Sequence, residues 1–389
     1  MFAVQAGVLA LAALPIWHLA RHANLTIEQG IAVAAVYLMY PLVFNINLFD
    51  FYPEVIAVPA LLGAVLAARL ERTGWFCLCI FLTLGCKAVL SITVAAMGVW
   101  LLVFEKKRRC GAIALVSGIS WFVIATKIII PFFGTQAASV ERHIGRYAYL
   151  GNSFSEIAKN LLLNLGLVLG QVFSLENLWY LLLLLVPVIW GLSLQGMQPL
   201  IATIPTLAIN LLSDSYLQKD LIRQYSLPLV PFLVLAVIST LAAGQGWLRN
   251  KRQIILWSLV AFMALAKYGY FFSIYLDSLD TWQATRQAVA LVQTKGSVLT
   301  TAEIAPHLTH RPVVELTSAN SPPTNLAKFD YILLNVTHPA WQSDQKFATN
   351  LVESLSKLSF TKSFIKYFFD EQRLIQYILS HREFEKNML

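Results

Sequence analysis

Charged residues are scarce in this sequence. They make up 13% of its 389 residues, whereas an ordinary soluble domain carries about 25%. Hydrophobic residues make up 57% of the chain and gather between Phe2 and Leu276 in runs of about 15 to 25 residues, the length of a helix that crosses a bilayer. The composition therefore excludes an ordinary soluble protein and predicts an α-helical polytopic membrane protein.

Motifs for nucleotide and metal chemistry are also missing. The sequence has no phosphate-binding loop, nucleotide-binding glycine fingerprint or nucleophile elbow, so it gives no support to ATP-driven chemistry. Four cysteines lie in or beside apolar runs without the spacing of a zinc or redox site, and we interpret them as packing residues. They are Cys77, Cys79, Cys86 and Cys110.

The net charge of +8 comes from short basic clusters, which orient helices rather than bind nucleic acid. The clusters are Arg21-His22, Arg69 to Arg72, Lys106 to Arg109 and Arg249 to Arg252. Positive loops stay on the cytoplasmic side, and about ten crossings with both termini outside place all four there. The predicted single helices are Phe2–Ala20, Ile31–Leu48, Val55–Ala68, Ala112–Phe133, Leu178–Leu194, Leu200–Leu212, Leu227–Ala243 and Ile254–Leu276.

Two apolar stretches do not fit single crossings. Trp75–Phe104 lies between two basic turns, so it is predicted to be a hairpin of two short helices that turns near Gly85 to Lys87. Leu161–Phe173 cannot be a further crossing if all four basic clusters are to lie on the cytoplasmic side. It is predicted to be interfacial or re-entrant.

The composition changes after Leu276. Residues 1–276 are assigned to the membrane domain, and alternating strands and helices in residues 277–389 predict a small soluble α/β domain on the non-cytoplasmic face. Its predicted strands lie in Gly296–Thr301, Arg311–Leu316 and Asp330–Asn335, its helices in Gln283–Gln293 and Phe347–Leu358, and a closing hairpin in Phe364–Leu379.

The first candidate site is the acidic segment from Asn45 to Glu54, at an outward-facing helix start. Asp50 and Glu54 are the candidate catalytic residues, as a carboxylate pair that binds a divalent cation such as Mg²⁺ or Mn²⁺ or acts as general base. The alternative is a well-capped helix start, since Pro53 suits the first turn and carboxylates there favour the helix dipole.

The second candidate site is a set of cations that face outward. Lys87 is the only charge in its apolar stretch, and it either contacts a lipid phosphate or snorkels to the interface. Arg142 and Arg146 lie four residues apart, on one face of a helix, where anionic headgroups or a lipid-phosphate donor would suit them. Arg223 and Tyr225 stand in a polar loop that suits sugar hydroxyls or water.

Several of these segments carry a resemblance. The chain resembles the DUF2079 family, prokaryotic membrane proteins catalogued as a domain of unknown function. The matching segments are Leu48 to Glu54, Gly85 to Lys87, Lys106 to Arg109, Trp121 to Pro131, Arg223 to Pro231, and Ser297 to Arg311.

That family looks like a branch of the GT-C clan, membrane glycosyltransferases that use polyprenyl-phosphate sugars on the non-cytoplasmic face. The resemblance implies that Asp50 and Glu54 match an acidic catalytic motif and that Lys87 contacts the carrier phosphate. The chain departs from the family pattern in two places. Ala88 and Val89 replace two carboxylates, and the family has a further first helix with an acidic loop, which would precede Met1. A partner chain is expected to supply that segment, and the chain is either a glycosyltransferase or a non-catalytic component that binds lipid-linked saccharide or assists assembly.

Overall fold

The computed structural model describes residues 2–134, 140–292, 294–322, 325–357 and 378–380. Contacts divide the chain into two compact units, Met1–Tyr268 and Gly269–Leu389.

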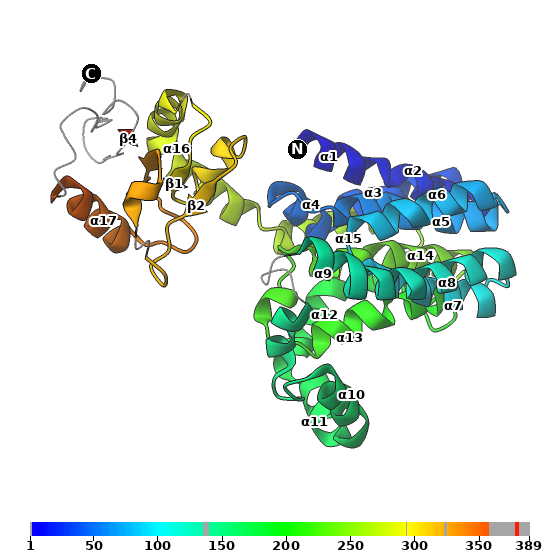
Figure 1. Ribbon diagram of the computed structural model, residues 1–389. Coiled ribbons are helices and arrows are strands. Elements are labelled where there is room, and N and C mark those ends of the chain that lie inside the picture. The colour runs from blue at the N-terminus through cyan, green and yellow to red at the C-terminus, as the bar shows by residue number, and fades with distance from the viewer. Residues whose placement is uncertain (1, 135–139, 293, 323–324, 358–377, 381–389) are drawn as a thin grey trace. The chain divides into compact units, whose positions relative to one another are not determined.

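The first unit is a bundle of helices (Figure 1). Its α-helices are α1 (Phe2–Leu11), α2 (Ala13–His22), α3 (Ile27–Leu38), α4 (Pro41–Leu48), α5 (Glu54–Arg69), α6 (Thr73–Cys86), α7 (Leu90–Val103), α8 (Arg108–Ile124), α9 (Ile130–Phe133), α10 (Phe154–Leu163), α11 (Leu165–Val172), α12 (Leu175–Leu185), α13 (Ile204–Leu211), α14 (Val230–Ala242) and α15 (Lys251–Leu265). A π-helical turn, Ala125–Ile129, joins α8 to α9, and 3₁₀ helices span Val140–Tyr147, Ile189–Gly191, Gln198–Thr203, Tyr216–Gln218 and Gln224–Leu229.

Three helices in the described part of the chain are long and apolar enough to cross a membrane. They are Phe2–His22, Arg108–Phe133 and Gln224–Ala242. The count rises to six if three bent pairs, α3 with α4, α11 with α12, and α15 with the first part of the next helix, each form one span. Apolar membrane helices are therefore present, but the ten predicted crossings are not confirmed.

Most helix boundaries follow the predictions, with three exceptions. The helix predicted at Ile31–Leu48 is divided into α3 and α4, which are bent by 45° where Pro41 begins α4. The predicted hairpin is confirmed as two helices, α6 and α7, which break at Lys87. The helix predicted to reach Leu194 instead ends at Leu185, because Pro187 follows and disfavours helical geometry in the residue before it. The helix predicted to reach Leu276 breaks after Leu265, where the Lys267 amide donates to the Asn45 side chain (2.8 Å) rather than to a helix carbonyl.

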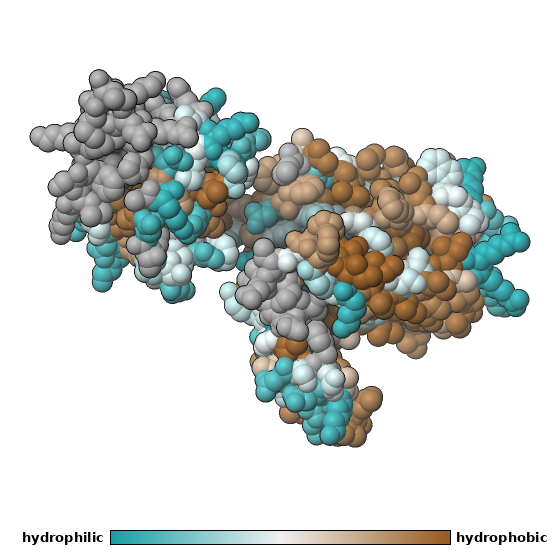
Figure 2. Space-filling model, in the orientation of Figure 1, coloured by the Kyte–Doolittle hydropathy of each residue, from teal (hydrophilic) through white to brown (hydrophobic). Residues whose placement is uncertain are grey.

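The helices differ in how much of their surface the unit covers. The span containing α14 is 83% buried, whereas the span containing α8 is 17% buried, so α14 forms the centre and α8 has a long apolar outer side. Figure 2 shows hydrophobic residues covering much of the visible side of the bundle. α8 also approaches α7 closely, since a Cβ on Gly98 would lie 2.5 Å from the Leu115 amide nitrogen.

The second unit is a small α/β domain. A long helix, α16 (Tyr268–Leu291), precedes β1 (Val298–Thr300), β2 (Val314–Leu316), β3 (Tyr331–Leu333), α17 (Gln345–Lys357) and β4 (Ile378–Ser380). The sheet order is β2-β1-β3-β4, with parallel pairing except between β3 and β4. All three predicted strands are found, but the helix predicted at Gln283–Gln293 is the end of α16. Most of the predicted hairpin Phe364–Leu379 lies outside the described residues.

Candidate functional site

The acidic segment and the hairpin lysine meet at the start of α5. Glu54 begins this helix and is only 3% exposed. Lys87 ends α6 with an extended backbone, and its ammonium donates a hydrogen bond to the Glu54 carboxylate. The Lys87 side chain is 41% exposed. A buried carboxylate is costly without a partner, so this ion pair explains how both charges are held between apolar helices.

The Tyr225 ring holds a second part of the site. Lys87 Nζ lies 5.8 Å from the ring centroid, and Arg146 Cζ lies 5.5 Å from it. Arg146 Nη2 also lies 3.5 Å from the Tyr225 hydroxyl oxygen. The two distances to the ring centroid are within the range of cation–π attraction, so one aromatic ring brings together two cations from separate segments.

Asp50 and Arg223 lie beside this group. The Arg223 guanidinium stacks over the Phe49 ring at 5.4 Å, and Asp50 is exposed. Burial raises the pKa of Tyr52 to about 12, and the charge of Asp50 adds to this rise while Arg223 opposes it. Asp50 and Arg223 therefore act electrostatically on the same short segment that carries Glu54.

Two buried amides fix the segment. Gln5 in α1 donates to the Ile46 carbonyl (2.8 Å) and accepts from the Tyr52 amide (3.3 Å). Asn45 donates to the Leu221 carbonyl (3.2 Å), which ties the loop before α14 to the end of α4. Sequence reasoning missed Gln5, and the available signal was a single amide in an otherwise apolar first helix.

The structure thus brings Glu54, Lys87, Arg146 and Tyr225 into contact and places Asp50 and Arg223 nearby, while the Arg142 side chain lies outside the described residues. The described residues contain no group of three or more His, Cys, Asp or Glu side chains that could hold a metal ion. Because Glu54 is already paired with Lys87, these residues do not fit a resident Mg²⁺ or Mn²⁺ site.

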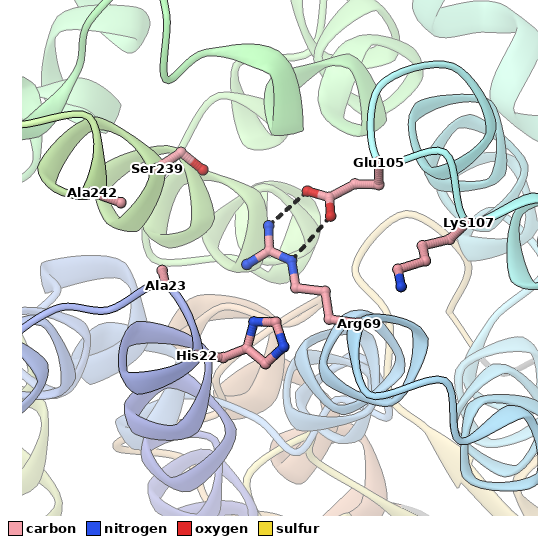
Figure 3. Close-up of a pocket in the computed structure, with 7 residues that line it drawn as sticks. All are labelled: His22, Ala23, Arg69, Glu105, Lys107, Ser239 and Ala242. Atoms are coloured by element: carbon pink, nitrogen blue, oxygen red, sulfur yellow. Dashed lines mark hydrogen bonds and ion pairs between the residues drawn. The ribbon is translucent and has the colours of Figure 1, made fainter.

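A pocket of about 380 Å³ lies at the other end of α5 (Figure 3). A helix of this length spans roughly 24 Å, so the pocket is remote from Glu54. Its lining is His22, Ala23, Arg69, Glu105, Lys107, Ser239 and Ala242.

The charges of this pocket have a structural explanation. Arg69 donates two hydrogen bonds to Glu105, of 3.2 and 2.7 Å. α2, α5 and α14 all end here, and their partially negative C-terminal ends favour a cation such as Arg69. The pocket is therefore a charge-neutralised helix junction, and the cluster around Lys87 is the better candidate site.

Comparison with known proteins identifies the family. No curated protein and no solved structure matches the chain. The family model described as "Predicted membrane protein (DUF2079)" matches residues 1–363. The chain therefore belongs to this family of membrane proteins.

Proposed function

We propose that the cluster around Lys87 binds a polyprenyl-phosphate-linked sugar at the outer face of the cell membrane, and that the chain transfers this sugar to an outer-face acceptor. The observation that carries the proposal is the Tyr225 ring, which holds Lys87 and Arg146 next to two carboxylates. In this proposal the chain crosses the membrane several times, and the second unit lies on the non-cytoplasmic side.

The cations suit the phosphate of such a donor. A lysine ammonium has three N–H donors, so Lys87 can keep its bond to Glu54 and also donate to a phosphate oxygen. Arg146 and Arg223 add planar donor groups suited to phosphate. When the sugar leaves, its carrier phosphate gains negative charge, so the same cations bind the transition state more strongly than the donor.

Asp50 and Glu54 have different roles in this proposal. Glu54 is buried and positions Lys87, whereas Asp50 is exposed and can accept a proton. Asp50 takes the proton of the acceptor hydroxyl while the oxygen of that hydroxyl bonds to the anomeric carbon of the sugar. The bond from that carbon to the phosphate oxygen breaks, and the polyprenyl phosphate leaves with the bonding electron pair.

A specific observation also favours a second candidate, binding without transfer. Glu54 is paired with Lys87, so of the two candidate carboxylates only Asp50 remains exposed. Ala88 and Val89 stand where the resemblance implies two further carboxylates, so this copy would have fewer groups for catalysis. A protein of this kind would carry a lipid-linked saccharide or assist the assembly of a partner chain.

Transfer of a radiolabelled sugar distinguishes the two candidates. The purified chain in lipid vesicles is given several polyprenyl-phosphate sugars and an outer-face acceptor extract. Asp50→Asn is expected to lower the transfer rate about 10²- to 10⁴-fold while donor binding persists, and Lys87→Met to lower both. Glu28→Gln, an exposed carboxylate at the start of α3, serves as the control. Donor binding by wild type without transfer would favour the second candidate.

A further inference from the structure

The pocket at the far end of α5 lies where membrane-length helices end. The apolar span Phe2–His22 ends at a residue that lines the pocket, His22, and the span Gln224–Ala242 ends at another, Ala242. The third span, Arg108–Phe133, begins directly after Lys107, which also lines the pocket. Helices of this kind end where the hydrocarbon core meets the lipid headgroups, so the pocket lies at the level of the headgroups.

The pocket has open space among polar groups. A single water needs only about 10–15 Å³ of such volume, so a pocket of about 380 Å³ has room for a polar headgroup. Figure 3 shows the His22 ring, the Lys107 ammonium and the Ser239 hydroxyl around this space. Ala23 and Ala242 also line the pocket, and their methyl groups are too small to fill it.

The turns around the pocket carry more positive than negative charge. The three turns that supply His22, Arg69 and Lys107 hold seven arginine and lysine residues against two glutamates. They are Arg21, Arg69, Arg72, Lys106, Lys107, Arg108 and Arg109 against Glu71 and Glu105. Arg69 and Glu105 neutralise each other inside the pocket, so the excess of positive charge lies at its rim.

Lys107 and Arg109 lie together at this rim. Lys107 Nζ lies 2.8 Å from the carboxylate of Glu71, whose side chain is 80% exposed. The hydrogen bond and the charge of Lys107 lower the pKa of Glu71, and the charge of Arg109 lowers it further, so both cations lie near this carboxylate. An exposed partner holds a lysine weakly, and the ammonium has three N–H donors. Lys107 can therefore also bind an anion in the pocket.

We infer that this pocket binds the headgroup of an anionic phospholipid in the leaflet at the basic end of the bundle, which its positive charge assigns to the cytoplasmic side. Lys107 and Arg109 attract the phosphate, and the Ser239 hydroxyl and the His22 ring can hydrogen-bond to the hydroxyls of a glycerol headgroup. Basic pockets between membrane helices on the cytoplasmic side bind acidic lipids in this way. The site is separate from the cluster around Lys87 and does not depend on the proposed function.

The apolar surface next to the pocket favours a lipid over free phosphate. α8 begins at Arg108, beside Lys107, and its span is only 17% buried. Acyl chains attached to a headgroup in the pocket can lie against this uncovered apolar side, which gives a lipid contacts that inorganic phosphate lacks.

Lipid binding by the full-length chain in a neutral detergent tests this site. The probes are phosphatidylglycerol and the zwitterionic phosphatidylcholine, and native mass spectrometry measures how many lipids stay bound. Lys107→Gln combined with Arg109→Gln is expected to raise the dissociation constant of phosphatidylglycerol about tenfold or more and to leave that of phosphatidylcholine nearly unchanged. Lys251→Gln combined with Arg252→Gln removes the same charge at the start of α15, outside the pocket lining, and should change either constant less than about threefold.

A change that fills the pocket separates this site from general attraction to a basic surface. Ala242 is exposed at the last position of α14, so Ala242→Trp keeps the charge, should leave the unfolding midpoint close to that of wild type and should weaken phosphatidylglycerol binding. Inorganic phosphate should not displace the lipid. Equal losses in the two charge variants would mean attraction to the whole basic end, binding that survives Ala242→Trp would place the headgroup elsewhere, and displacement by inorganic phosphate would mean a site for free anions. Each of these results would overturn the inference.

Discussion

The energetic coupling between Lys87 and Glu54 is the most informative quantity to predict for the membrane unit. Glu54 is almost completely buried, and its ion-pair partner, Lys87, lies at the break between α6 and α7. Removing one partner of a buried pair costs about 3–5 kcal/mol. Since the Lys87 side chain is 41% exposed, solvent screens part of this, and we expect Lys87→Met to lower the free energy of unfolding by about 2 kcal/mol.

A double-mutant cycle isolates this coupling. Glu54→Gln removes the buried charge and should cost about 1 kcal/mol, and adding Lys87→Met to it should cost little more. Thermal unfolding in detergent, followed by tryptophan fluorescence, measures each variant, with about 2–4 °C expected per kcal/mol. The ion pair of Lys107 with the exposed Glu71 is the matched control, because solvent screens it and its coupling should be much weaker. If the Lys87 and Glu54 costs add within about 0.5 kcal/mol, the pair is not coupled and the reasoning is refuted.

Three further perturbations test the packing and electrostatics around the site. Gly98→Ala should lower the free energy of unfolding by about 1–3 kcal/mol, because its Cβ would meet the α8 backbone. The Cβ of Gly85→Ala would meet nothing within 4 Å, so this change should cost little, and equal losses for the two variants would contradict the close packing. Gln5→Leu should cost about 1–3 kcal/mol because it leaves the Tyr52 amide without its partner, and a neutral result in the same unfolding assay would mean that water replaces the Gln5 side chain. The pKa of Tyr52 is about 12 when folded and near 10 when unfolded, so the folded state binds more protons between these values and stability falls as pH rises from about 10 to about 12. Tyr52→Phe should remove part of that fall, and identical pH profiles of the unfolding midpoint would contradict the shifted pKa.

The hairpin break could be predicted from the sequence because its signal is local. Lys87 is the only charge in an apolar stretch between two basic turns, and both the cost of an intramembrane charge and the charge of the turns favour a break there. Strands β1, β2 and β3 of the second unit are likewise predictable, since each is a brief apolar run bounded by turn residues.

Other features depend on contacts between distant segments. Lys87 pairs with Glu54 across 33 positions, and Asn45 reaches Lys267 across 222 positions. The sequence predicts that Lys87 and Glu54 both face outward but cannot pair them, because helix packing decides which side chains meet.

Photo-crosslinking locates the donor lipid most directly. A photoactivatable amino acid replaces Phe49, whose ring lies under Arg223. In a second variant it replaces Trp247, an exposed residue beyond the end of α14. A polyprenyl-phosphate sugar should form an adduct at position 49, lost on competition with unlabelled polyprenyl phosphate and in Lys87→Met. Equal adducts at both positions, or an adduct at position 49 that neither competition nor Lys87→Met reduces, would contradict a phosphate site at Lys87.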